Sequence, residues 1–121
     1  NLLNFRTLLH FGAKVLILGI AYKKNVDDLR ESPSLELIDL LQKKGADVNY
    51  HDFYIPKLRQ TRNYSLHLDS IDLDCQISTY DLVILATDHD SYNYNFLQEK
   101  SKLIVDTRGK LDRNLPNVIA A

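Results

Sequence analysis

The sequence has little of several features that would indicate a specialised class of protein. Its 121 residues include no methionine, no tryptophan and a single cysteine, Cys75. One cysteine forms no internal disulfide, which fits a reduced, cytoplasmic chain. The formal net charge is only −1, so we expect neither a nucleic-acid surface nor a polybasic membrane patch. A site for an anion must therefore be local.

Membrane-spanning and secretion signals are also missing from the sequence. No apolar stretch approaches the roughly 20 residues needed to span a bilayer, and the first ten residues lack the cleavage site of a signal peptide. The length suits one compact domain. Because no initiator methionine is present, we interpret the chain as a fragment. Residues 1–12 are then the end of a linker or central helix, and residues 13–121 are one ligand-binding domain.

Three aliphatic runs predict strands that are buried on both faces, which is typical of a parallel sheet. They are "KVLILGI" (14–20), "YDLVILATD" (80–88) and "KLIVDTRG" (102–109). The segment "DVNYHDFYI" from residue 47 alternates at its start and predicts another strand, and "LPNVIAA" at the C-terminus predicts a short edge strand. Residues 57–78 alternate in part and leave a strand or an irregular connection open.

A helix is predicted between the first two strands. Ser32 is its N-cap, Pro33 occupies its first position and Gly45 follows its end. The apolar residues between them recur on one stripe (Leu35, Ile38, Leu41), and two lysines match the dipole of the last turn (Lys43, Lys44). A shorter helix is expected over residues 96–100.

Alternation of strands and helices predicts an α/β fold, a three-layer Rossmann-like domain with a mostly parallel sheet flanked by helices. Polar clusters follow three of the strands, at residues 19–30, 87–90 and 106–108. Because the carboxyl ends of parallel strands share one edge, these clusters should meet there. We expect a ligand site at that edge.

The stretch "GIAYKKNVDDLRESPS" (19–34) is the most charged of the three clusters. Lys23 or Arg30 could hold a phosphate beside the N-terminus of the following helix. The alternative is a solvated loop whose acids and bases pair with one another. No G-x-G-x-x-G or P-loop spacing decides between the two.

The remaining candidates have weaker signals. Arg108 is either a ligand contact or a partner for a loop carboxylate. We interpret His89 in "TDHD" as a solvated loop histidine, in preference to a base or a sugar contact, and treat His51 with the same caution. Cys75 has no neighbouring histidine and is interpreted as structural. No histidines and acids fall at ligand spacings, so we expect no metal.

Three motifs carry a resemblance to a known family: "LGIAYKKNVDDLRESPSLELIDLL", "YDLVILATDH" and "LIVDTRG". Together they resemble the C-terminal, nucleotide-sugar-binding domain of the UDP-glucose/GDP-mannose dehydrogenases. The first string is most similar to the branch that acts on UDP-N-acetylhexosamines. The resemblance implies NAD-dependent oxidation of a sugar C6 alcohol to a carboxylate for polysaccharide precursors, through a thiohemiacetal on a cysteine.

The resemblance also implies roles for four residues. Tyr22 and Lys23 match the pair that contacts the nucleotide sugar, and Arg108 matches an arginine that contacts the substrate. Arg30 matches the arginine that reaches NAD. The implied partners are an N-terminal NAD-binding domain and a central helix of the same enzyme, which assembles as a homodimer or larger.

The chain departs from the family by lacking the glycine-rich N-terminal domain and the catalytic cysteine motif, which Cys75 does not match. We therefore expect this polypeptide to bind but not to catalyse. One alternative is a stand-alone nucleotide-binding or interaction module without chemistry. Another is a flavodoxin- or receiver-like signalling domain, which the basic residues at the strand ends disfavour. The identity of the sugar and the oligomeric state of the fragment stay open.

Overall fold

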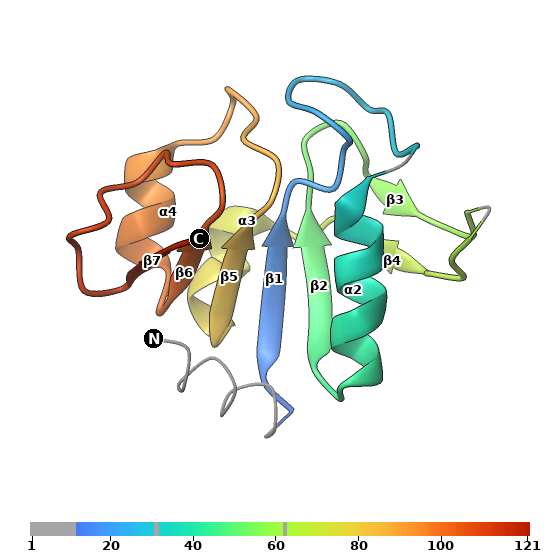
Figure 1. Cartoon of the computed structure of the whole chain (residues 1–121), viewed down its shortest axis with the longest axis horizontal. Helices are drawn as coiled ribbons and strands as arrows, with labels where there is room; N and C mark the ends of the chain where they lie inside the picture. Colours follow the sequence, from blue (N-terminus) through green and yellow to red (C-terminus); the bar gives the residue numbers. More distant parts are fainter. Residues whose placement is uncertain (1–11, 31, 62) are drawn as a thin grey trace.

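The computed structural model describes residues 12–30, 32–61 and 63–121 (Figure 1). Five strands form one sheet in the order β2-β1-β5-β6-β7, and all four neighbouring pairs are parallel. The strands are β1 (Lys14–Leu18), β2 (Asp47–His51), β5 (Leu82–Leu85), β6 (Ile104–Asp106) and β7 (Val118–Ala120). All three aliphatic runs, the alternating segment and the C-terminal edge strand are confirmed as strands.

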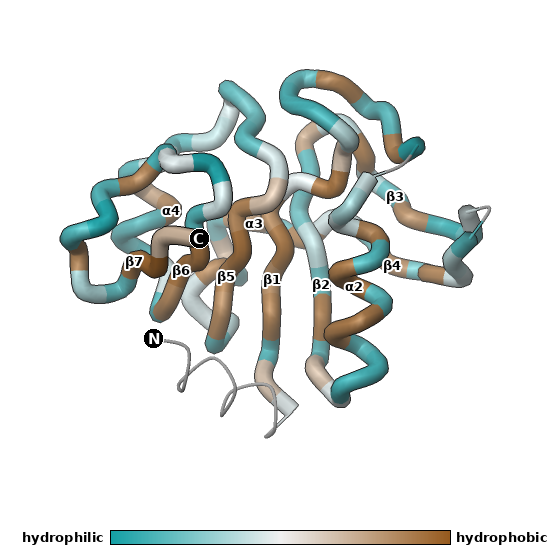
Figure 2. The backbone as a smooth tube through the Cα atoms, in the orientation of Figure 1, coloured by the Kyte–Doolittle hydropathy of each residue, from teal (hydrophilic) through white to brown (hydrophobic). Residues whose placement is uncertain are grey.

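Helices cover both faces of this sheet. On one face α2 (Pro33–Lys43) packs against Val15 and Ile17. On the other face lie α3 (Leu73–Gln76), the 3-10 helix η1 (Ile77–Thr79) and α4 (Tyr94–Lys100). There Leu16 and Leu18 join a second core. Alternate residues of β1 thus enter opposite cores, which explains its continuous apolar run; Figure 2 shows β1 and β5 as hydrophobic over most of their length.

The helix α2 forms as its end signals predict. Ser32 precedes it with extended backbone, and its hydroxyl accepts a hydrogen bond from the Ser34 N–H at 3.3 Å. The same hydroxyl donates to the carbonyl of Ile20 at 2.6 Å, which ties the helix start to the end of β1. The predicted stripe is buried (Leu35, Ile38, Leu41). The N-cap and the position of the helix are confirmed.

The ambiguous segment 57–78 contains several short elements. A two-stranded antiparallel hairpin, β3 (Lys57–Leu58) and β4 (Leu68–Asp69), precedes α3 and η1. The shorter predicted helix is present as α4 and begins at Tyr94, two residues before the predicted start. The helix expected to end near Gly12 lies outside the described residues. Among the residues described, no helix is both long and apolar enough to cross a membrane.

The order of the strands creates a switch point between β1 and β5. From β1 the chain moves to β2 on one side, and it later returns to β5 on the other side of β1. The connections that leave β1 and β5 rise at the same edge of the sheet, at the top of Figure 1. In open parallel sheets, the crevice at such a point is where ligands bind.

Candidate functional site

The three polar clusters meet at this edge, as the sequence predicts. The hydroxyl of Thr87, after β5, donates to the carbonyl of Ala21, after β1, at 2.8 Å. The guanidinium Nε of Arg108, after β6, donates to the carbonyl of Ala86 at 2.9 Å. The segments that follow β1, β5 and β6 thus contact one another at this edge of the sheet.

The loop after β1 begins in a very restricted space at Gly19. This residue has φ of +82°, and a Cβ built on it would lie 2.4 Å from the Cβ of Thr87. Its N–H donates to the carbonyl of His51 at 2.8 Å. A side chain is therefore excluded both by the backbone conformation and by the close approach of β5.

Asp52, which directly follows β2, is a buried carboxylate that organises the same loop. Its Oδ2 accepts hydrogen bonds from the N–H groups of Ile20 at 2.8 Å and Ala21 at 3.2 Å. Its Oδ1 accepts from the N–H of Tyr54 at 2.8 Å. Burial opposes ionisation, but these donors and the imidazole of His89 outweigh it, so the pKa of Asp52 lies below its ordinary value.

The interpretation of His89 as a solvated loop histidine is wrong. Its side chain is fully buried, its Nε2 lies 3.0 Å from Oδ2 of Asp52, and its Nδ1 accepts from the N–H of Asn25 at 2.8 Å. His51 is buried too, with its Nδ1 3.0 Å from the hydroxyl of Tyr92. Sequence alone gave no sign of either burial, because the partners are distant in sequence and lie in loops that follow other strands.

Asp106 has a comparable role at the end of β6. Its carboxylate accepts hydrogen bonds from the N–H groups of Arg108, Gly109 and Leu111, each at 2.8–2.9 Å. These contacts shape the turn that presents Arg108. The Arg108 side chain donates to the carbonyl of Ala86, and among the described residues no carboxylate pairs with it.

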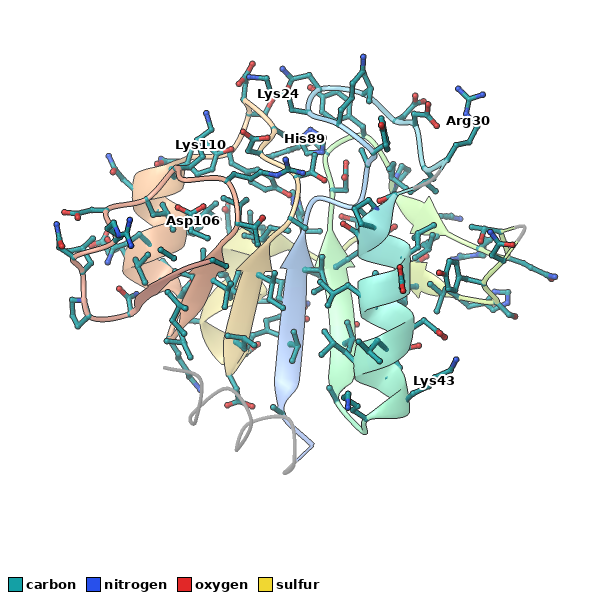
Figure 3. All side chains as sticks on the ribbon, viewed as in Figure 1. Lys24, Arg30, Lys43, His89, Asp106 and Lys110 are labelled. Atoms are coloured by element: carbon teal, nitrogen blue, oxygen red, sulfur yellow. The ribbon has the colours of Figure 1, made fainter. Side chains whose placement is uncertain are left out.

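Between these fixed points the loop exposes its charged residues. The guanidinium of Arg30 donates to both carboxylate oxygens of Asp28, at 3.1 and 3.0 Å. This contact holds the pKa of Asp28 at about 2. Lys24 lies 3.8 Å from Asp90. Figure 3 shows Arg30 directed away from Lys24 and His89, beyond the start of α2. Arg30 and Asp28 pair within the loop, as the solvated-loop alternative predicts, whereas Lys24 pairs with a carboxylate of the β5–α4 connection.

A groove of about 980 Å³ opens beside Arg30. Tyr22 and Leu29 line it from the loop, Ser32 and Pro33 from the start of α2, and Thr61, Asn63 and Tyr64 from the connection between β3 and β4. Of the four residues predicted to contact ligands, Tyr22 and Arg30 line this groove. Lys23 is exposed on the loop, and Arg108 lies after the end of β6. The wall that Thr61, Asn63 and Tyr64 provide was not predicted.

Cys75 lies on α3 and is exposed. Asp72 accepts a hydrogen bond from its N–H and raises the pKa of its thiol. A thiol with a raised pKa is a weak nucleophile at neutral pH. Its exposure shows that the side chain is not part of the core.

This architecture defines a doubly wound α/β domain. Its candidate site lies at the carboxyl edge of the sheet, at the switch point. Residues 16–113 match the sequence profile of the UDP binding domain of the UDP-glucose/GDP-mannose dehydrogenase family. The chain belongs to this family. The resemblance stated from the three motifs is thereby confirmed, as is the Rossmann-like α/β fold class.

Known proteins of the family are similar over most of the chain. A UDP-N-acetyl-D-mannosamine dehydrogenase of Methanocaldococcus jannaschii is 35% identical over 111 residues, which cover 84% of this chain and 24% of that protein. A UDP-glucose dehydrogenase structure from Pyrobaculum islandicum is 31% identical with a TM-score of 0.71, covering 98% of this chain and 27% of the other. The chain spans about a quarter of the length of the curated relatives that it matches.

Proposed function

We propose that the chain is the nucleotide-sugar-binding, C-terminal domain of an NAD-dependent UDP-sugar 6-dehydrogenase. Residues 13–121 form this domain, and residues 1–12 are the end of a linker from preceding parts of the enzyme. The observation that carries the proposal is the meeting of Tyr22 and Arg30 in one groove at the carboxyl edge of the sheet, inside a matched UDP binding domain. The aromatic ring suits the base or ribose of the nucleotide sugar, and the guanidinium suits the phosphates of NAD, so two anionic ligands would meet at this edge.

The substrate is a UDP-N-acetylhexosamine, either UDP-N-acetylglucosamine or UDP-N-acetylmannosamine. Several similar proteins are UDP-N-acetyl-D-mannosamine dehydrogenases. Tyr22, Lys23 and Arg108 contact the nucleotide sugar. The two cations supply charge-assisted hydrogen bonds to its phosphates, and each such bond is stronger than a neutral one.

The donors at the groove also fit NAD. Arg30 has the planar fork that matches a pyrophosphate, and it stands beside the N-terminus of α2, where unpaired N–H groups favour anions. Bound NAD would supply the acceptor for the hydride that leaves the sugar C6. The part of this chain is to bind and orient, and the reacting cysteine belongs to another domain of the same enzyme. We propose that this enzyme is cytoplasmic and a homodimer or larger, and that the chain alone is inactive.

Titration of the chain with UDP, followed by amide shifts in NMR, tests the proposal. We expect saturable shifts at Tyr22, Lys23 and the 106–109 turn, and none with inorganic phosphate at the same concentration. GDP is the matched comparison, because a weaker response to it identifies selection of the base.

Absence of any shift at millimolar UDP contradicts independent binding by this domain. The same titration on the longer enzyme then separates two causes. Shifts that appear there show that binding needs the other domains, whereas continued absence contradicts the proposed function.

A further inference from the structure

We infer that His89 is a positioning residue for the proposed nucleotide site, and that it acts through the backbone of Asn25. This inference rests on the proposed function, because the residues it positions are those proposed to bind UDP. His89 itself is fully buried beneath the loop that carries Lys24 (Figure 3). It acts through another residue and has no contact with a ligand.

The hydrogen bonds define one tautomer of the imidazole. A backbone N–H only donates, so Nδ1 of His89 must accept the bond of 2.8 Å from Asn25. The proton of the neutral ring is then on Nε2, which donates to Oδ2 of Asp52 at 3.0 Å. The ionised carboxylate of Asp52 is a suitable acceptor and holds the ring in this tautomer.

Asp52 therefore holds both ends of a three-residue segment. It binds the N–H of Ala21 directly at 3.2 Å, and it binds the N–H of Asn25 through the ring of His89. Tyr22, Lys23 and Lys24 lie between these two attachments. Asp52 and His89 thus hold the backbone on both sides of these three residues in place.

Two further features make Asn25 an attachment point. Its φ of +64° is uncommon for a residue other than glycine, and an asparagine tolerates it better than most. Its side chain exchanges two hydrogen bonds with Asp90, at 2.6 and 2.9 Å. The tip of the loop is thus bound to the β5–α4 connection by both its backbone and its side chain.

A matched pair of substitutions separates positioning from stability. In His89→Asn, the amide oxygen stands close to where Nδ1 was and still accepts from Asn25, but the contact with Asp52 is lost. In His89→Gln, the longer side chain places its amide near the former position of Nε2 and keeps the hydrogen bond to Asp52. It has no acceptor at the former position of Nδ1, so the bond from the Asn25 N–H is lost. His89→Asn removes more buried volume and leaves a buried carboxylate with one donor fewer, so it should be the less stable variant.

The experiment measures the unfolding free energy, the hydrogen exchange of the Asn25 amide and the affinity for UDP. All three quantities are measured in the wild type, His89→Asn and His89→Gln. We expect His89→Gln to exchange faster at Asn25 and to bind UDP about fivefold more weakly, as for one lost hydrogen bond. We expect His89→Asn to stay close to the wild type in both, despite its lower stability. His67→Gln, at an exposed histidine, is the control and should change nothing.

The inference is overturned if His89→Asn, the less stable variant, also exchanges faster at Asn25 than His89→Gln does. A purely structural role of His89 predicts that result. NMR of the imidazole nitrogens in the wild type gives an independent decision. Protonated Nε2 with bare Nδ1 supports the inference, and the reverse tautomer refutes it even if a variant fails to fold. Should the wild-type chain not bind UDP, the affinities are measured in the longer enzyme, and the proposed function fails only if that enzyme does not bind UDP either. Hydrogen exchange at Asn25 decides the role of His89 in both cases.

Discussion

The loop after β1 contains two regions that are built in opposite ways. Residues 19–21 are buried, and their polar groups are bonded to Asp52, Thr87 and Ser32. The residues from Tyr22 onward are largely exposed, and Tyr22 itself is 50% exposed. The first region fixes where the loop starts, and the second presents side chains to solvent. Residues that hold the loop in place and residues proposed to bind the ligand are therefore adjacent in sequence. The former depend on buried hydrogen bonds, whereas the latter are exposed to solvent.

The largest effect should follow from breaking the buried region at its tightest point. Gly19→Ala combines a positive φ with a Cβ that would meet Thr87 at 2.4 Å. We expect a loss of about 3–5 kcal/mol in the free energy of unfolding, measured with urea. Gly45→Ala is the control, since Gly45 also has a positive φ, +93°, but nothing lies within 4 Å of its Cβ position.

The control isolates the cost of the backbone conformation, about 1–2 kcal/mol. Equal losses in the two variants would show that β5 yields to the added methyl group. The packing between the ends of β1 and β5 would then be looser than the distances indicate.

A smaller loss should follow from removing the charge that organises the buried region. For Asp52→Asn we expect a loss of about 2–3 kcal/mol at neutral pH, because hydrogen bonds to a charged group are lost or weakened. Asp69→Asn, at an exposed carboxylate paired with Arg59, should change stability by less than about 0.5 kcal/mol.

The pH dependence of this loss has a definite sign. The pKa of Asp52 is lowered on folding, so its contribution is complete above the pKa of the unfolded chain, about 3.9, and is lost as the pH falls below that value. The gap between wild type and Asp52→Asn in urea titrations should therefore narrow in acid. A gap that stays constant between pH 7 and pH 3 would mean that folding does not lower the pKa of Asp52.

The same contrast explains how much of the molecule the sequence alone predicts. Strands with continuous aliphatic runs and a helix with both end signals are local patterns, and these were predicted correctly. The exposed basic residues Lys23 and Arg30 were also visible as candidates. The buried role of His89 was not, because it depends on Asp52, which is 37 residues away in sequence. The segment with the hairpin strands β3 and β4 was left open between a strand and an irregular connection, since strands of two residues each are too short for alternation to define them.

A substitution in the exposed region should weaken UDP binding without changing the free energy of unfolding. We expect Lys23→Ala to weaken UDP binding by about 1.5–3 kcal/mol, the range for a hydrogen bond to a charged group. The unfolding free energy should not change, because Lys23 is exposed. Calorimetric titration measures the affinity, and Lys43→Ala, which removes an exposed lysine that pairs with Asp39 on α2, is the matched control. An affinity equal to that of the wild type removes Lys23 from the site.

The smallest effect on stability is expected at the pair of Arg30 and Asp28, and titration should report it more clearly than unfolding. The Arg30 side chain is exposed and that of Asp28 is partly exposed, so solvent screens the pair and Arg30→Ala should lower the free energy of unfolding only slightly. The hydrogen bonds from Arg30 are the main cause of the low pKa of Asp28, about 2 in the wild type. Without the guanidinium this pKa should rise toward 3.8, as measured by the carboxyl carbon shift in NMR.

Because the folded pKa is the lower one, the pair favours the folded state above about pH 4 and ceases to do so as the pH falls through 2. A pKa that stays near 2 in Arg30→Ala would instead assign the shift to the N–H of residue 30, which also donates to Asp28 and survives the substitution. The order of the exposed region would then depend on its backbone more than on this pair of side chains.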